Sequence, residues 1–142
     1  NPQSLVTFTW EKALNMEGNS APYLQYAYAR ISSVHDKYRE RFPGGDIDRF
    51  RIAITHPLER RLALKLSRFP AAVRGAAENY RPNILADYLY DLAQIYSSFY
   101  QNVPFLKAEE GVRESRIRLC RAAARTLRTG LGLLGIETPE RI

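Results

Sequence analysis

The sequence predicts an all-α protein, a bundle of four to five helices. In several separate stretches apolar residues recur every three or four positions, which is the spacing of one face of a helix. Prolines and glycines fall between these stretches, where they begin and end helices. No strand pattern competes with this interpretation, although Phe50, Ile52 and Ile54 alternate with other residues in a segment that we expect to be an irregular loop.

The first helix is expected over residues 21–40. Ser20 is a favoured N-cap residue, and Pro22 falls in the first turn, where its missing N–H costs nothing. The run 43–46, Pro-Gly-Gly-Asp, predicts its end. Ahead of it we expect a lead-in over residues 1–19, with a short helix at 10–14 and a break at Gly18.

Three further stretches complete the bundle. A helix is expected to begin at Pro57, to be kinked or broken at Pro70, and to continue as a further helix over 71–80. The next runs from Pro82 to Pro104, with its buried face predicted at Leu85, Leu89, Leu92, Tyr96, Phe99 and Val103. The last is expected over 108–134, with an apolar side at Ile117, Cys120, Ala124, Leu127, Leu131 and Leu134. Gly130 and Gly132 are expected to weaken its end, and Gly135 to stop it.

Composition limits the possible classes of protein. The 142 residues suit one domain, and 45% hydrophobic content is ordinary for a globular chain. No apolar run approaches the roughly 20 residues that span a membrane. The single cysteine, Cys120, favours a buried thiol in a reducing, cytoplasmic setting. The net charge of +6 favours anionic partners, without separating nucleic acid from lipid headgroups.

One face of the first helix carries the most informative pattern. Tyr23, Tyr26 and Arg30 follow one another at spacings of three and four, so they share that face. Two phenol rings beside a guanidinium can stack on and hydrogen-bond an unpaired base. The alternative is that the tyrosines belong to the core, with satisfied hydroxyl groups.

Two other sets of residues could bind RNA. Arg118, Arg121, Arg125 and Arg128 recur on the last helix and could follow phosphates, or could form an ordinary solvated face. Arg113 and Arg116 could extend this set, or could pair with Glu109, Glu110 or Glu114. Tyr100 and Phe105 flank the turn before that helix and could stack on bases, although Phe105 could instead pack that helix on the preceding one.

Catalytic chemistry has little support in the sequence. His35 and His56 stand apart and have no cysteine neighbours, so metal-ligand spacing is absent. We expect His56 to lie in a loop or cap a helix, and His35 to complement a helix dipole. No glycine-rich phosphate loop and no nucleophile–base pair can be assembled.

The run EGNSAPYLQYAYARI at 17–31 resembles the start of the anticodon-binding domain of arginyl-tRNA synthetases. The ending LGIETPERI at 134–142 resembles that family's C-terminus, and YLYDLA at 88–93 with Phe99 and Tyr100 resembles its middle helix. The resemblance implies a helical bundle of the class I synthetase anticodon-binding (DALR) type over 20–142, with 1–19 leading in from a preceding catalytic domain. A literal D-A-L-R string is absent from this chain.

The resemblance also implies a function and a site. Such enzymes join arginine to tRNA with ATP and Mg, but their HIGH-type and KMSKS-type motifs are absent here, so the fragment itself is expected to bind RNA without catalysis and without a cofactor. The family's pocket for the anticodon, mostly with a middle cytosine, implies roles for Tyr23, Tyr26, Arg30, Tyr100 and the terminal residue. That residue is Ile142, where the family usually has methionine.

Three alternatives remain open at this point. The chain could be a stand-alone paralogue that uses this domain for another RNA. The bundle could belong to another class I synthetase, such as the cysteine or methionine enzyme. It could also be a helical protein–protein interaction module, because Tyr and Arg are enriched at the hot spots of protein interfaces.

Overall fold

A computed structural model describes residues 7–15 and 18–139, and within them it contains helices and turns but no strand. This confirms the all-α prediction. The elements, in chain order, are α1 (Trp10–Ala13), α2 (Ala21–Arg41), the 3₁₀ turn η1 (Ile47–Arg49), α3 (Pro57–Ser67), α4 (Phe69–Glu78), α5 (Pro82–Asn102) and α6 (Val112–Leu133).

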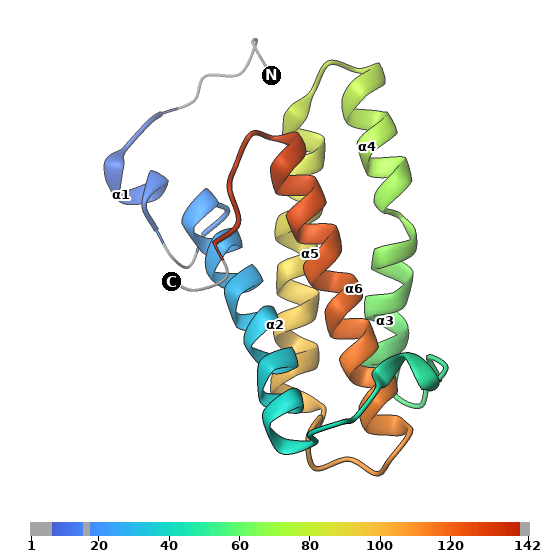
Figure 1. Cartoon of the computed structure of the whole chain (residues 1–142). Helices are drawn as coiled ribbons and strands as arrows, with labels where there is room; N and C mark the ends of the chain where they lie inside the picture. The colour runs from blue at the N-terminus through green and yellow to red at the C-terminus, as the bar shows by residue number, and fades with distance from the viewer. Residues whose placement is uncertain (1–6, 16–17, 140–142) are drawn as a thin grey trace.

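The long helices α2, α5 and α6 lie side by side, and α3 and α4 follow one another along the opposite side of the bundle (Figure 1). Helix α2 packs on α6 and α5, whereas α3 packs on both α5 and α6. The short α1 stands away from the bundle, near the start of α2. None of the described helices is long and apolar enough to cross a membrane.

Local signals set most helix ends, as the sequence predicts. The Ser20 hydroxyl accepts a hydrogen bond from the Tyr23 amide at 3.3 Å, and Pro22 lies in the first turn of α2. His56 caps α3, since its Nδ1 accepts from the Leu58 amide at 3.1 Å. Gly135 has φ +75° and the Ile136 amide donates to the Leu131 carbonyl, which is the glycine-dependent end of a helix.

Other boundaries differ from the prediction. The predicted break before a further helix is present, but it lies at Arg68 instead of Pro70: α3 ends at Ser67, and α4 begins at Phe69 with Pro70 in its first turn. Helix α6 begins four residues later than expected, at Val112, after Gly111 with φ +86°. The loop at 43–56 is mostly irregular, as expected, but contains η1.

The predicted apolar stripes form the core. All six residues predicted for the face of α5 are buried, as are Ile117, Cys120, Leu127 and Leu131 of α6. The Cys120 thiol accepts from the Tyr96 hydroxyl at 3.7 Å, and burial raises the pKa of the thiol to about 12. The prediction of a buried thiol is therefore confirmed, and the thiolate form is disfavoured at neutral pH.

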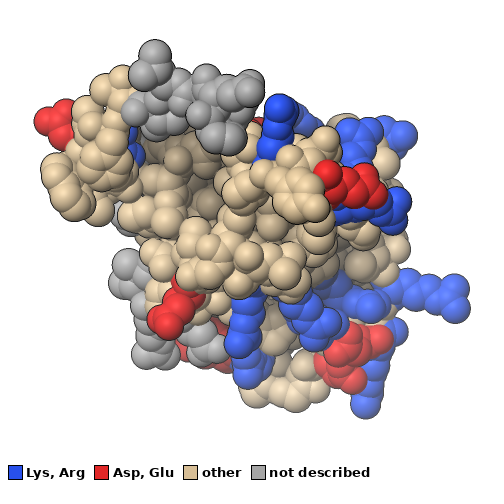
Figure 2. All heavy atoms as spheres, turned by 90° about the horizontal axis from the view of Figure 1, so that it is seen from above, with Lys and Arg blue, Asp and Glu red and all other residues tan. Residues whose placement is uncertain are grey.

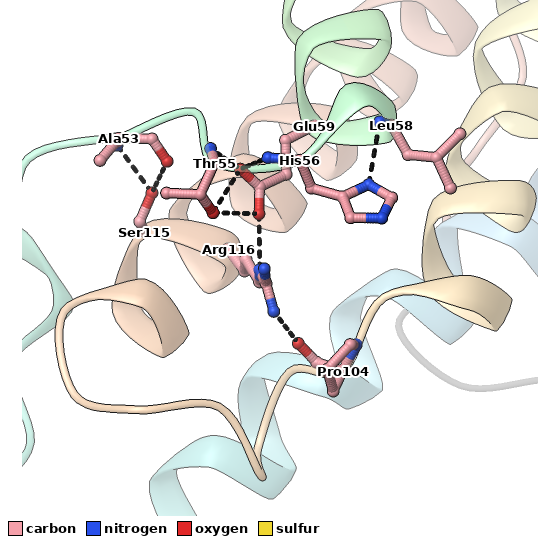
Figure 3. Close-up of polar contacts among 8 residues, drawn as sticks. All are labelled: Ala53, Thr55, His56, Leu58, Glu59, Pro104, Ser115 and Arg116. Atoms are coloured by element: carbon pink, nitrogen blue, oxygen red, sulfur yellow. Dashed lines mark hydrogen bonds and ion pairs between the residues drawn. The ribbon is translucent and has the colours of Figure 1, made fainter.

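A buried polar cluster, the Glu59 cluster, joins the loop 51–56 to the bundle (Figure 3). Glu59 is fully buried and accepts from Arg116 Nε at 2.6 Å and from the Thr55 amide at 2.7 Å. Arg116 Nη1 also donates to the Pro104 carbonyl at 2.7 Å. Ser115 adds a second link, because its hydroxyl exchanges hydrogen bonds with both backbone groups of Ala53. Arg116 is therefore a structural residue, with a partner outside the acidic residues considered from the sequence.

Candidate nucleic-acid interface

Helix α2 presents the predicted tyrosine–arginine face toward one edge of α5. Tyr23 is half-buried, Tyr26 is 46% exposed, and Arg30 is half-buried two turns from Tyr23. Pro22 and Ser20 fix the start of the helix and so fix the position of Tyr23 in its first turn. The two tyrosines therefore differ, since Tyr23 is held by neighbours and Tyr26 offers a free ring to solvent.

Helix α5 completes this surface with residues that the sequence analysis did not include. The Tyr23 ring lies 5.5 Å from the ring of Tyr90, and Gln94 Nε2 donates to the Tyr23 hydroxyl at 2.8 Å. Ser97 lies near enough to the Tyr23 hydroxyl to lower its pKa. These α5 residues are spaced by four and three, so they lie on one face of the helix.

Arg30 and Tyr100 are brought together as predicted. The guanidinium carbon of Arg30 lies 4.3 Å from the centroid of the Tyr100 ring. This cation–π arrangement links the middle of α2 to the end of α5. We call the whole set the α2–α5 surface; its members are Tyr23, Tyr26, Arg30, Tyr90, Gln94, Ser97 and Tyr100.

Phe105 supports this surface from inside the bundle. Its side chain is only 8% exposed, and its ring packs edge-on against Phe99 at 4.9 Å and beside Tyr100 at 5.6 Å. A ring buried in this way has no free face for stacking. The structure therefore places Phe105 as the residue that holds the loop after α5 on the core, the alternative considered from the sequence.

The Tyr23 hydroxyl keeps its proton at neutral pH. Burial raises its pKa, and the nearby Ser97 side chain, the hydrogen bond from Gln94 and the charge of Arg30 offset this only in part. A neutral phenol can donate a hydrogen bond as well as accept one. With the amide group of Gln94 and the guanidinium of Arg30, this end of the α2–α5 surface offers both donors and acceptors to a base edge.

The four arginines predicted on α6 divide into two pairs. Arg121 forms a two-pronged ion pair with Asp48 of η1, and Arg118 donates to the Phe50 carbonyl and lies 3.8 Å from Asp48. Arg125 and Arg128 are exposed and form no ion pair among the described residues. Asp48 therefore neutralises part of the stripe, and its own pKa is held below the usual range, above all by the hydrogen bond from Arg121.

This stripe lies on the other side of α2 from the tyrosines. Three of the α6 arginines and, from α2, His35, Asp36 and Arg39 line a hollow of about 220 Å³, the α2–α6 groove; the α6 arginines are Arg121, Arg125 and Arg128. Arg30 and Arg39 are nine residues apart, about two and a half turns, so they point to opposite sides of α2. Figure 2 shows Lys and Arg mostly along the right and lower edges as seen from above, with Asp and Glu side chains beside them.

The chain after α6 returns toward α2. Following Gly135, it runs back along the bundle toward the first half of α2 (Figure 1), where Gln25 Nε2 donates to the Glu137 carbonyl at 2.8 Å. Gln25 adjoins Tyr26 in sequence. Ile142, predicted to contact the same site, lies outside the described residues.

Both histidine side chains accept hydrogen bonds from within the protein. His56 caps α3 as predicted. His35 accepts a hydrogen bond from Arg39 at 3.2 Å, and burial and the Arg39 charge lower its pKa, so it is disfavoured as the cation that a helix-dipole role requires. Over residues 7–15 and 18–139, no group of three or more His, Cys, Asp or Glu is placed to hold a metal ion.

Comparison with known proteins gives one consistent family. The DALR anticodon binding domain family matches residues 24–142. An arginine–tRNA ligase of Proteus mirabilis is 45% identical over 140 residues, which covers 95% of this chain and 23% of that protein. One of Thermococcus sibiricus is 42% identical over 146 residues, covering 99% of this chain and 22% of that protein.

Solved structures agree with this assignment. The Thermus thermophilus arginyl-tRNA synthetase matches with a TM-score of 0.87 at 40% identity, over 99% of this chain and 24% of that one. The Plasmodium falciparum enzyme matches with a TM-score of 0.79 at 27% identity, over 96% of this chain and 24% of that one. This chain spans about a quarter of the length of these relatives. The resemblance noted from the sequence is thus confirmed: the chain belongs to the DALR anticodon binding domain family, in the form found in arginyl-tRNA synthetases.

Proposed function

We propose that this chain binds the anticodon loop of arginine tRNAs as one domain of a cytoplasmic arginine–tRNA ligase. The observation that carries the proposal is the α2–α5 surface, where exposed and half-buried tyrosines, a guanidinium and an amide group converge from two helices. In the whole enzyme, a preceding domain would join arginine to the tRNA with ATP and Mg. This domain would supply recognition, and the reaction would take place elsewhere.

Recognition would proceed by base unstacking. A loop base that leaves the RNA stack can lie against the free ring of Tyr26, since base–aromatic stacking contributes about 1–3 kcal/mol per base. Its polar edge would then meet the Tyr23 hydroxyl, the Gln94 amide and Arg30. The first two are already oriented by their mutual hydrogen bond, and Arg30 is oriented by its contact with the Tyr100 ring. Groups that are held in place before binding lose less entropy when the RNA arrives.

The test is binding of the chain to an arginine-tRNA anticodon stem-loop over a range of salt concentrations. A matched stem-loop, with the middle cytosine changed to adenine, is measured beside it. We expect tighter binding of the cytosine loop, with affinity falling as salt rises. Equal affinity for the two loops would contradict base recognition, and a chain that binds neither loop would favour a helical protein–protein module.

Tyr26→Ala tests the stacking residue itself. We expect the affinity for the cytosine stem-loop to fall by about 1–3 kcal/mol, the contribution of one base stack. Folding should be unaffected, because Tyr26 is 46% exposed and makes no ring contact among the described residues. Tyr80→Ala is the matched control, since Tyr80 is 92% exposed at the turn between α4 and α5. Equal losses in both variants would remove Tyr26 from the site.

A further inference from the structure

A basic hollow adjoins the α2–α5 surface at its Tyr100 end. It lies between the second half of α2 and the connection from α5 to α6, and its volume is about 530 Å³. The α2 residues that line it are Val34, Lys37 and Arg41, and the remainder is the run 100–107. We call this feature the basic hollow.

The basic hollow is lined by positive charges without a negative charge beside them. Lys37, Arg41 and Lys107 line it, and no Asp or Glu does. None of these three forms an ion pair among the described residues, whereas Arg113, Arg116 and Arg121 each pair with a carboxylate. Three cations that converge on one hollow with no protein anion are suited to an anionic ligand.

The hollow is continuous with the proposed base site. Tyr100 lines the hollow and also carries the Arg30 guanidinium on its ring. Arg30, Lys37 and Arg41 lie on one face of α2 at spacings of seven and four, so Lys37 is about 10 Å along the helix from Arg30. A strand of RNA that places a base near Arg30 and Tyr26 can therefore continue into the hollow without crossing α2.

We infer that the basic hollow binds the phosphodiester backbone of the nucleotides next to the recognised base. This inference rests on the proposed function, and it assigns the positive charge that holds the loop to Lys37, Arg41 and Lys107. Asn102 adds a polar group: its Nδ2 donates to the Ser98 carbonyl at 2.8 Å, which leaves the amide oxygen able to accept from a ribose 2′-hydroxyl.

The first test removes the three charges together as Lys37→Gln, Arg41→Gln and Lys107→Gln. We expect affinity for the cytosine stem-loop to fall about tenfold or more at low salt. The slope of log affinity against log salt should become shallower by about 0.7 for each lost contact to a single-stranded phosphate. The preference for cytosine over adenine should persist, because the α2–α5 surface is intact.

The matched control is Arg60→Gln, Arg74→Gln and Arg81→Gln, which removes the same charge from exposed positions on α3, on α4 and at the start of α5. Equal salt slopes in the two triple variants would overturn the inference. The proposed base recognition is tested separately, by the parent chain alone. If the parent chain does not prefer the cytosine loop, the proposed base recognition is contradicted. A parent chain that does not bind RNA overturns both.

A second test identifies the contact from the side of the RNA. Single phosphates of the loop are replaced one at a time by uncharged methylphosphonates. At one or two positions next to the recognised base, we expect this change to weaken binding of the parent chain and to leave binding of the Lys37, Arg41 and Lys107 triple variant unaffected. If every position weakens both proteins equally, the hollow does not contact the backbone.

Discussion

Gly130 shows how a single residue sets the distance between two helices. It is buried in α6, and a Cβ atom at this position would lie 2.5 Å from Leu89 Cδ2 of α5. Gly130→Ala should therefore destabilise the fold by about 1–3 kcal/mol through overpacking. This loss should exceed the gain of about 1 kcal/mol that alanine brings to a helix interior. Urea unfolding measures the difference.

Gly132 is the control for that substitution. It lies two residues further along the same helix, and a Cβ there would meet no atom within 4 Å. Gly132→Ala should therefore stabilise the protein by up to about 1 kcal/mol. If the two substitutions change stability in the same direction, the close approach to Leu89 is not the reason for glycine at 130.

The sequence predicted the α2 half of the α2–α5 surface and Tyr100 of α5, but not Tyr90, Gln94 or Ser97. Helical spacing alone places Tyr23 and Arg30 on one face. Which residues of α5 meet that face depends on how the two helices are rotated, and packing decides this. The spacing of Tyr90, Gln94 and Ser97 beside the apolar stripe of α5 was the available signal, because it places all three on one face at the border of the core.

At the scale of elements, the Glu59 cluster fastens the loop 51–56 to α3 and α6. Burial raises the pKa of Glu59, but hydrogen bonds from the Thr55 and His56 amides and from Arg116 together hold it below its ordinary value of 4.5. A carboxylate whose pKa is lower in the folded state stabilises the fold above its unfolded pKa. That stabilisation is lost as the pH falls through the folded-state pKa.

Glu59→Gln tests this cluster. At neutral pH we expect a loss of about 3–5 kcal/mol in unfolding free energy, because Arg116 is left as an uncompensated buried charge. As the pH falls below about 4.5, the parent should lose stability more steeply than the variant, since the variant lacks this titrating group. Denaturant unfolding across the acid range measures both effects.

The double variant Glu59→Leu with Arg116→Met separates the missing charge partner from general damage. Replacing both partners by apolar residues should recover part of the stability lost in Glu59→Gln, since no charge then remains buried. A double variant less stable than Glu59→Gln would show that the hydrogen bonds to the loop 51–56, rather than the charge balance, dominate.

The sequence predicts a helix end well where a capping residue sets it. Ser20, His56 and Gly135 act within a few residues of their own position, so the sequence predicted the helix ends that they set. The Glu59–Arg116 pair joins residues 57 positions apart, and nothing local indicates it. From the sequence, the expected ion-pair partners of Arg116 are therefore the acidic residues near it in the chain. The same holds for Asp48, whose pairing with Arg121 depends on where the bundle places η1.

At the scale of the whole molecule, α2 separates two basic regions. The basic hollow and the α2–α5 surface lie on one side, and the α2–α6 groove with Arg125 and Arg128 lies on the other. The sequence predicted Arg30 and the arginines of α6 but neither the cations of the basic hollow nor that the two regions face apart, because this arrangement follows from α2 packing against both α5 and α6. If an RNA loop binds the α2–α5 surface, only a more distant part of the same tRNA can contact the α2–α6 groove.

Arg125→Gln combined with Arg128→Gln tests this arrangement. Binding of the short anticodon stem-loop should fall less than about threefold, because screened charges on the far side of α2 contribute weakly. Whole tRNA should show a larger loss and a shallower salt dependence if its stem reaches the groove. The cytosine preference should be the same for the variant and the parent on both RNAs. If the variant loses this preference on the stem-loop, the recognised base binds in the α2–α6 groove, and the α2–α5 surface has another role.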